Sequence, residues 1–265
     1  MNLYSKKLYL ARISCLIDTR IREFDISKAN ISVLRDANII SEDLYQDLFV
    51  GPKMKRSVTI GKLQGQDPQI SEVLKQGIEN ARKIFLQAND IGDNEILAIN
   101  NDSITIIGNK PIRILDITER VRFRLDGEYT SYYLINQIGC FYFYDRITRI
   151  ENIKIKGMGE DKVALHREYL LDFFKELFYT AQIDGIKPAM DLLSNFYNLY
   201  IAKQLPIEYC REFNAMSKFR MISEMSMIST MFMDWVTEMD RKYINDATNM
   251  HILLDLNKML YSNLK

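Results

Sequence analysis

The sequence predicts an α+β protein, with a mixed α/β region over residues 1–158 and a helical domain over residues 159–265. Two isoleucine-rich runs, Ile96–Ile99 and Ile104–Ile107, flank a polar, turn-prone break and form the pattern of a β-hairpin. Apolar residues recur at helical spacing upstream of this hairpin, and only helical patterns occur from Glu160 onward. These three observations are the basis of the expected fold class.

The chain is long and apolar enough to bury a sizeable core. It has 265 residues, of which 47% are hydrophobic and 11% aromatic, so one large domain or two to three small ones are expected. Lys and Arg together number 35, as do Asp and Glu, and the formal net charge is zero. This balance excludes a histone-like nucleic-acid coat but allows a basic groove, because charge can be unevenly distributed.

Cysteine and histidine usage restricts the chemistry. Cys15, Cys140 and Cys210 are widely spaced and odd in number, so we expect no zinc motif, no disulfide framework and a reducing, cytoplasmic setting, which for a viral protein is the host cytoplasm. With only His166 and His251, histidine-based metal or triad chemistry is nearly excluded. No signal peptide and no run of about 18 apolar residues is present, so we expect no membrane partner.

The N-terminal part is expected to combine helices with one strand. Residues 1–19 mix apolar and basic positions and predict a leading helix, and residues 21–27 predict the first strand. A helical pattern runs over Ile26–Val50, where Ser41 followed by two acidic residues marks a helix start.

A basic cluster, Lys53–Gly61, follows the first Gly-Pro break and has the composition of a solvated loop. Gln64–Asp67 is a further polar loop, and Pro68 begins the next helix. Apolar residues then recur at helical spacing over residues 70–88, and Gly92 marks the end of this helix. We expect its apolar face to pack on the sheet that carries the hairpin.

The last two thirds of the chain change from strands to helices. The strand patterns predict an antiparallel meander, and the helical patterns include an aromatic stripe and a methionine-rich segment that are expected in the core. The predicted strands are 129–134, 138–144 and 147–155, and the predicted helices are about 160–183, 186–203, 206–240 with a break near Ser217, and 243–263.

Two aspartates are placed where strands end. Asp102 follows the hairpin tip at Asn100-Asn101, and Asp25 ends the first strand. Either residue alone is read as an ordinary turn cap. Together, on neighbouring strands, two such carboxylates could share a pair of divalent ions, as phosphoryl transfer by two metals requires.

Short motifs in a shared order resemble those of family B DNA polymerases. Asp25–Ser32 stands in the place of D-x-x-S-L-Y-P-S, Lys53 precedes Ile60-Gly61 as a lysine precedes Tyr-Gly in the family, and Ala98–Ser103 stands in the place of Y-x-D-T-D-S. Downstream, Ile155–Met158 resembles the K-G-[IM] turn before the thumb, and Lys203–Glu208 resembles a thumb helix junction. The chain therefore resembles a reduced, divergent family B polymerase that retains only palm and thumb.

The resemblance implies an antiparallel palm-like sheet with packed helices, a short fingers insertion at about residues 35–68, and an all-helical, thumb-like C-terminal domain. It implies a template-dependent nucleotidyltransferase in which Asp25 and Asp102 are catalytic and hold two Mg²⁺ (or Mn²⁺) ions. The implied nucleotide-binding residues are Lys53, Lys55, Arg56, Gly61 and Asn30. The implied nucleic-acid-binding residues are Arg120, Arg122, Arg124, Arg146, Arg149, Lys154 and Lys156.

The implied partners are a primer–template, nucleoside triphosphates and a partner protein that supplies missing polymerase parts. The chain departs from the family pattern because Ile60 and Asn100 replace a tyrosine and an aspartate, and because the lysine-rich tetrad and exonuclease region are not visible. Asn30 replaces the tyrosine that screens the sugar 2′-position, which predicts weak discrimination against ribonucleotides unless Tyr45 takes over that role. The alternatives are a catalytically inactive, polymerase-like subunit that binds nucleic acid or assembles with other proteins, and an unrelated α+β protein.

Overall fold

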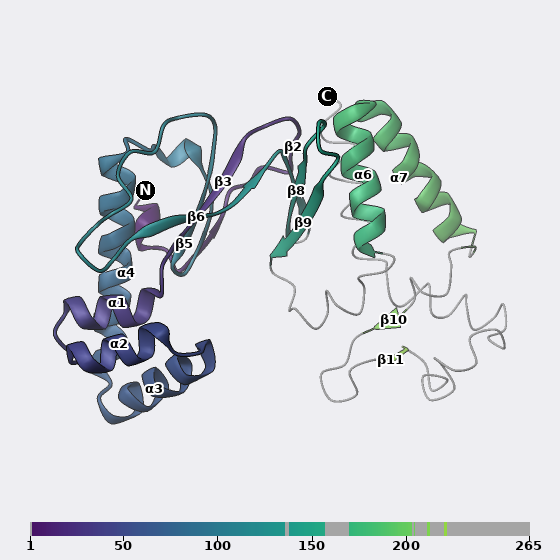
Figure 1. Cartoon of the computed structure of the whole chain (residues 1–265). Coiled ribbons are helices and arrows are strands. Elements are labelled where there is room, and N and C mark those ends of the chain that lie inside the picture. The colour runs from purple at the N-terminus through teal and green to yellow at the C-terminus, as the bar shows by residue number, and fades with distance from the viewer. Residues whose placement is uncertain are drawn as a thin grey trace. The chain divides into compact units, whose positions relative to one another are not determined.

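The computed structural model of the chain (Figure 1) describes residues 2–135, 138–156, 170–202, 204, 211–212 and 220–221. These residues form an α+β protein with two main sheets and six α-helices. The chain divides into two compact units, one made of Met1–Arg12 and Arg20–Glu128 and the other of Ile13–Thr19 and Tyr129–Lys265. No described helix is both long and apolar enough to cross a membrane.

The first unit carries a five-stranded sheet in the order β1-β4-β5-β3-β6. The central neighbours β4, β5 and β3 pair antiparallel, as does edge strand β1 with β4. The elements of this unit are η1 (Leu3–Ser5), β1 (Leu8–Leu10), β3 (Ile21–Ile26), α1 (Ala29–Asp36), α2 (Glu42–Val50), α3 (Lys53–Gln66), α4 (Gln69–Ala88), η2 (Asp93–Glu95), β4 (Ile96–Asn100), β5 (Ser103–Ile107) and β6 (Phe123–Tyr129).

The predicted hairpin is confirmed as β4 and β5. Ile99 pairs with Ile104 and Asn100 with Ser103, so the two intervening residues form the turn. Asn101 adopts a left-handed conformation with φ of 52°, which asparagine tolerates better than most residues. The hairpin thereby brings its turn to the end of the sheet where β3 also ends, because Asp25 is paired with Ser103.

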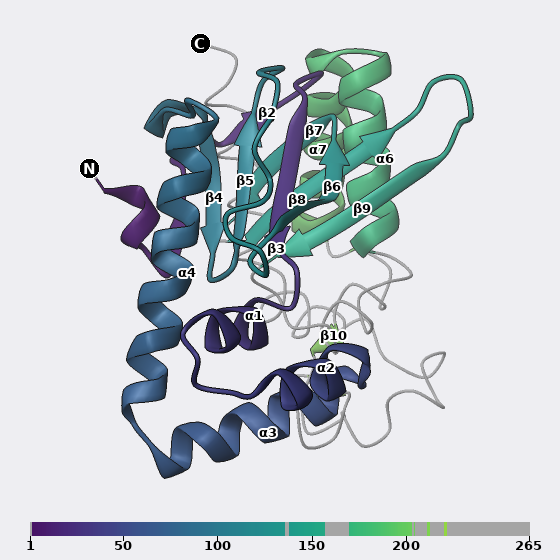
Figure 2. The same ribbon diagram turned by 60° about the vertical axis from the view of Figure 1, so that its left-hand side comes forward.

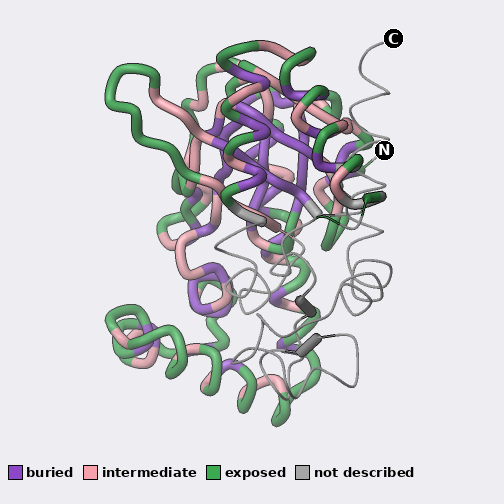
Figure 3. Tube along the Cα trace, turned by 90° about the vertical axis from the view of Figure 1, so that its right-hand side faces the viewer, coloured by how far each residue is buried: buried purple, intermediate pink, exposed green. Residues whose placement is uncertain are grey.

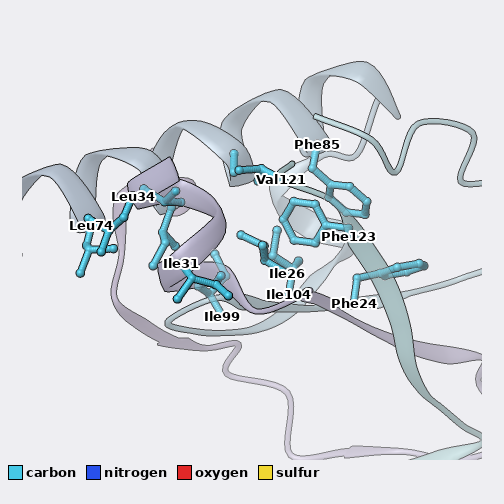
Figure 4. Close-up of a cluster of buried hydrophobic side chains, with 14 of the residues drawn as sticks. Phe24, Ile26, Ile31, Leu34, Leu74, Phe85, Ile99, Ile104, Val121 and Phe123 are labelled. Carbon is cyan, nitrogen blue, oxygen red and sulfur yellow. The ribbon is translucent and has the colours of Figure 1, made fainter. Parts of the chain in front are cut away.

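The helix predicted over residues 70–88 is confirmed as α4, which lies along the sheet (Figure 2). Its apolar face contributes Phe85, whose ring centroid lies 5.3 Å from that of Phe24 and 4.3 Å from that of Phe123. Figure 4 shows these rings beside Ile26 and Ile104 of the strands. The expected packing of this helix on the hairpin sheet is therefore correct.

The segment between α1 and α4 consists of helices α2 and α3 with short connections, which corrects two predicted loops. The Ser41 hydroxyl accepts a hydrogen bond from the Leu44 amide and caps α2 as predicted. The basic cluster and the polar residues after it form α3, because Pro52 occupies the helix N-cap and buried Ile60 anchors the helix to the core. Figure 3 shows that most of α2 and α3 is otherwise exposed.

The second unit carries a four-stranded antiparallel sheet in the order β2-β7-β8-β9. Tyr142 stacks on Phe178 with 5.1 Å between ring centroids, and the predicted aromatic stripe of α6 lies in this core. The elements are β2 (Cys15–Leu16), β7 (Ser131–Ile135), β8 (Ile138–Tyr144), β9 (Glu151–Lys156), α6 (Leu170–Ile183), α7 (Ile186–Ile201), β10 (Arg211–Glu212) and β11 (Arg220–Met221).

Three further local predictions are corrected. Residues 1–19 form no α-helix within their described part, because β1 and β2 each complete the edge of a sheet. The third meander strand begins at Glu151 rather than at residue 147, because the Asp145 carboxylate accepts hydrogen bonds from the Ile147 and Thr148 amides and fixes a turn. Within the predicted helix 206–240, the short strands β10 and β11 pair antiparallel.

Several predictions fall outside the described residues. They concern the helix 243–263, most of the helix 206–240, the methionines after Met221, Cys210, both histidines and the turn at Gly157-Met158. The predicted boundary at residue 158 stays a prediction, since residues 157–169 are among these, although the meander strands cluster with α6 and α7. The two described cysteines, Cys15 and Cys140, are free thiols.

Candidate metal and nucleotide site

A cavity of about 560 Å³ in the first unit gathers charged side chains of both signs. Its walls come from the end of β3, the start of α1, the first turns of α3, the hairpin turn and β6. The charged residues that line it are the carboxylates Asp25 and Asp102 and the cations Lys28, Lys53, Arg56 and Arg124. Carboxylates beside a surplus of cations can bind a ligand that carries both a metal ion and phosphates.

The backbone brings the two aspartates together. β3 and β5 are neighbours in the sheet, and the Ile26 amide donates a 3.2 Å hydrogen bond to the Asp102 carbonyl. Asp25 is paired with Ser103, the residue after Asp102. Both aspartates line the same cavity, Asp25 from β3 and Asp102 from the hairpin turn before β5. That their carboxylates share a divalent ion stays a prediction.

Burial, and then the charge of Asp102, raise the pKa of Asp25 to about 6. Arg124 opposes this rise, because its Nη2 lies 3.4 Å from Asp25 Oδ2 and also 3.5 Å from Asp126 Oδ1. Arg124 therefore offsets the unfavourable ionisation of Asp25 beside Asp102 only in part. A cation bound between the carboxylates would relieve this repulsion.

Lys28 has a left-handed backbone conformation, and its side chain contacts Phe49 at the cavity wall. It precedes α1 with φ of 49°, its Nζ lies 3.3 Å from the centroid of the Phe49 ring, and it donates a hydrogen bond to the Phe49 carbonyl. Burial lowers the pKa of Lys28, and the positive charges of Arg56 and Arg124 lower it further. These three cations are therefore close enough to repel one another, which favours an anionic ligand among them.

The N-terminus of α3 adds to this positive end of the cavity. Lys53 is the first residue of the helix, and its ammonium group has no hydrogen-bond or ion-pair partner among the residues that the structure describes, although its carbonyl accepts a hydrogen bond from the Ser57 hydroxyl at 3.1 Å. Arg56 Nη1 donates to the Gly51 carbonyl at 2.5 Å and to the Leu48 carbonyl at 3.4 Å, which ties α3 to the end of α2. Free amides and the helix dipole at such an N-terminus favour negative charge.

The remaining nucleotide-site candidates are divided. Asn30 lines the cavity, as does Ile60. Lys55 does not line it, because its Nζ is paired with Asp47 Oδ1 at 2.6 Å. Gly61 does not line it either, and an added Cβ there would meet nothing within 4 Å. Tyr45 is buried in the core, and the aromatic residue that lines the cavity is Phe49.

Of the basic residues assigned to nucleic-acid binding, Arg124 alone lines this cavity. Arg120 pairs with Glu42 at 3.0 Å and Arg122 with Asp116 at 3.0 Å, both within the first unit. The others belong to the second unit, where Arg146 contacts Asp18 at 3.7 Å and the Gln182 carbonyl at 3.2 Å. That part also carries Arg149, Lys154 and Lys156.

The donor set fits a hydrated magnesium ion better than a fully protein-bound metal. No group of three or more His, Cys, Asp or Glu side chains within the described ranges is arranged to hold a metal. Mg²⁺ commonly takes one or two carboxylates from the protein and completes its shell with water and substrate phosphates. Asp25 and Asp102 supply such a pair, with cations for the phosphates on the same wall.

Two charged residues, Lys28 at the cavity and Arg82 beside the turn that presents Asp102, were not singled out from the sequence. Lys28 lies among ordinary loop residues, and no sequence signal marks it. Arg82 is different, because it follows Ile78 by four residues and precedes Phe85 by three, which places it in the apolar stripe of α4. A charged residue in such a stripe is expected to be buried for a reason, and Arg82 is only 2% exposed.

Comparison with known proteins identifies a phage family. A search of curated proteins gave no match. The sequence profile of a family described as bacteriophage PBS1 gene 130 protein matches residues 1–262, which is nearly the whole chain. The chain therefore belongs to the bacteriophage PBS1 gene 130 protein family.

Proposed function

We propose that the protein is a template-dependent nucleotidyltransferase of polymerase type, in which Asp25 and Asp102 hold two Mg²⁺ (or Mn²⁺) ions. The observation that carries this proposal is a single cavity lined by both aspartates, one from β3 and one from the turn before its neighbour β5, together with four cations. In this proposal the five-stranded sheet is the palm, α2 and α3 are short fingers, and the C-terminal part acts as a thumb. The substrates are nucleoside triphosphates and a primer–template.

In this proposal the acidic residues of the cavity bind metal ions and the basic residues bind phosphates. Asp25 and Asp102 supply hard oxygen ligands, and bound ions would acidify a primer 3′-hydroxyl and offset charge on the reacting phosphate. Lys53, Arg56 and Lys28 face the same space and would neutralise the triphosphate and the departing pyrophosphate. The free amides of α3 would add hydrogen-bond donors to that end.

One contact favours the alternative of an inactive, polymerase-like subunit. Arg124 already lies 3.4 Å from Asp25 and partly balances its charge from within the protein. A chain that had lost catalysis could keep such an internal ion pair in place of a metal, while its basic side chains still bound nucleic acid or a partner protein.

Primer extension with Mg²⁺ or Mn²⁺, on DNA and RNA templates, separates these functions. The active site predicts incorporation by the wild type and a loss of at least about a hundredfold in Asp25→Asn and Asp102→Asn, because each removes a metal ligand. Asp116→Asn is the matched control, since this exposed carboxylate pairs with Arg122 outside the cavity.

Equal activity in all four proteins would overturn the assignment of the two aspartates. No incorporation by the wild type on any template, combined with primer–template binding that both Asp→Asn variants retain, would favour the inactive subunit. Folding of each variant is checked by its thermal unfolding, which should stay within a few degrees of the wild type.

A further inference from the structure

The turn that presents Asp102 is fixed by three different elements. The Asn101 amide donates to the Lys7 carbonyl beside β1 at 2.8 Å. The Asp102 carbonyl accepts from Ile26 of β3, at 3.2 Å. From α4, Arg82 Nη1 donates to the Asn101 carbonyl. A turn whose middle residue has positive φ is thereby held on both backbone groups of Asn101.

Burial of the Arg82 side chain for this contact lowers the stability of the fold. Its side chain is 2% exposed, and its Nε is buried without a hydrogen-bond partner among the described residues. Burying an incompletely paired guanidinium costs stability, and an apolar side chain of similar size often stabilises such a position. Burial lowers the pKa of the Arg82 guanidinium, and the negative charges of Glu79 and Asp102 oppose this shift.

We propose that Arg82 is a positioning residue, whose hydrogen bond to the Asn101 carbonyl sets the turn so that the Asp102 carboxylate faces the metal-binding cavity. The inference rests on the proposed function for the role of Asp102 as a metal ligand. Arg82 itself does not line that cavity and touches no reacting group. It acts through the peptide next to Asp102, as outer residues do that orient metal ligands.

A second cavity makes this role open to chemical rescue. It has a volume of about 440 Å³ and is lined by Arg82 and Asn101, with Lys7 and Lys75 at its exposed parts. Asn30 lines both this cavity and the one that holds the aspartates. Truncation of Arg82 would therefore leave a space that a guanidinium ion can enter from solvent.

The first test measures Mn²⁺ affinity by electron paramagnetic resonance, in protein without nucleotide. Arg82→Met should fold with equal or higher stability yet bind Mn²⁺ about tenfold or more weakly, the range seen when a residue that orients a metal ligand is lost. Arg82→Lys should bind with intermediate affinity, because its ammonium can still donate to the carbonyl.

Guanidinium should restore binding to Arg82→Ala but not to Asp102→Asn. Lys83→Ala, a change of the adjacent cation on the same helix, is the control and should bind as the wild type does.

An affinity for Mn²⁺ in Arg82→Met within twofold of the wild type would overturn the inference. The second test does not depend on metal binding. Hydrogen exchange at the Asn101 amide should accelerate by about tenfold or more in Arg82→Met, while exchange at Ile106, in the middle of β5, stays as in the wild type. If the wild type binds no Mn²⁺, the proposed metal site fails, and unchanged exchange at Asn101 would then refute the positioning role separately.

Discussion

At the scale of single residues, the candidate site is defined by an imbalance of charge around Asp25. Its carboxylate is partly buried beside Asp102, and Arg124 compensates only in part. Proteins keep such unfavourable pairs where a ligand or ion offsets them in the working state. The cost should therefore be measurable in the absence of metal.

The pH dependence of stability measures that cost. Because the pKa of Asp25 is about 6 in the folded protein against 3.8 as its ordinary value, the folded state favours the protonated form. The free energy of unfolding that Asp25 contributes should fall as pH rises from about 4 to about 6, and stay low above that. Asp25→Asn should remove this fall and stabilise the metal-free protein at pH 7 by up to about 3 kcal/mol.

Urea unfolding of the wild type and Asp25→Asn from pH 4 to pH 7 tests this directly. The quantity of interest is the difference between the two proteins at each pH, since other carboxylates titrate in both. A difference that does not grow as the pH rises through this window would show that Asp25 carries no unfavourable charge.

Asn30 tests the choice of sugar. Its side chain lines the cavity, is smaller than an aromatic ring, and offers a donor and an acceptor for a 2′-hydroxyl. We predict that the wild type discriminates weakly against ribonucleotides and that Asn30→Tyr gains about tenfold or more in preference for deoxyribonucleotides, by filling this space. Asn30→Ala, which keeps the space open, should stay permissive.

Competing incorporation of ribo- and deoxyribonucleotides is the measurement for Asn30. A strong deoxyribonucleotide preference in the wild type that Asn30→Tyr leaves unchanged would remove Asn30 from the site. In that case Phe49, the aromatic residue on the cavity wall, is the side chain to truncate next. Tyr45 is a poor candidate for this role because it is packed in the core.

At the scale of elements, α1 and α4 pack against each other in the core of the first unit. Gly77 of α4 faces Val33 of α1, and a Cβ added at Gly77 would lie 2.3 Å from Val33 Cγ1. Ala is the better helix former by about 1 kcal/mol, so helix propensity alone predicts that Gly77→Ala stabilises the protein. The close contact predicts the opposite.

We expect Gly77→Ala to destabilise the protein by about 1–3 kcal/mol, because the two helices must separate or Val33 must leave its position. The double variant Gly77→Ala with Val33→Ala should recover part of this loss, since it removes the clashing methyl groups. Chemical denaturation of the three proteins measures the effect. A stabilised Gly77→Ala variant would show that the helices are not packed as described.

Some elements of the fold could be predicted from the sequence and others could not. The hairpin and α4 were predictable because their periodicity of two or 3.6 residues extends over a whole element. The strands β1 and β2 were not, because each is only two or three residues long and exists by pairing with a distant strand. Helix α3 looked like a loop because it buries only Ile60 and therefore has almost no apolar stripe.

The candidate site could be predicted from the sequence only in part. The proximity of Asp25 and Asp102 could be predicted, because Asp25 lies near the end of β3 and Asp102 lies in the turn before β5, which pairs with β3. Lys55 and Gly61 were misplaced relative to the cavity, because sequence position along α3 does not reveal which side of the helix faces it. Arg82 was visible as a charge in an apolar stripe, but its partner across 19 residues was not.

At the scale of the whole molecule, the protein has two compact units and belongs to a phage protein family. In the first unit, the cavity of about 560 Å³ brings together two aspartates and four cations from five elements and loops. The second unit adds an antiparallel sheet and two helices with a separate aromatic core. Its role in the proposal is to bind the nucleic acid whose end reacts at the first unit.

The most direct test of this account is the position of bound metal, measured as anomalous scattering from crystals of the wild type grown with Mn²⁺ and a non-hydrolysable nucleoside triphosphate. The account predicts manganese peaks at the carboxylates of Asp25 and Asp102, with the triphosphate against Lys53 and Arg56 and with Arg124 displaced from Asp25. A map in which Asp25 stays paired with Arg124, and manganese is absent from both aspartates, would contradict it.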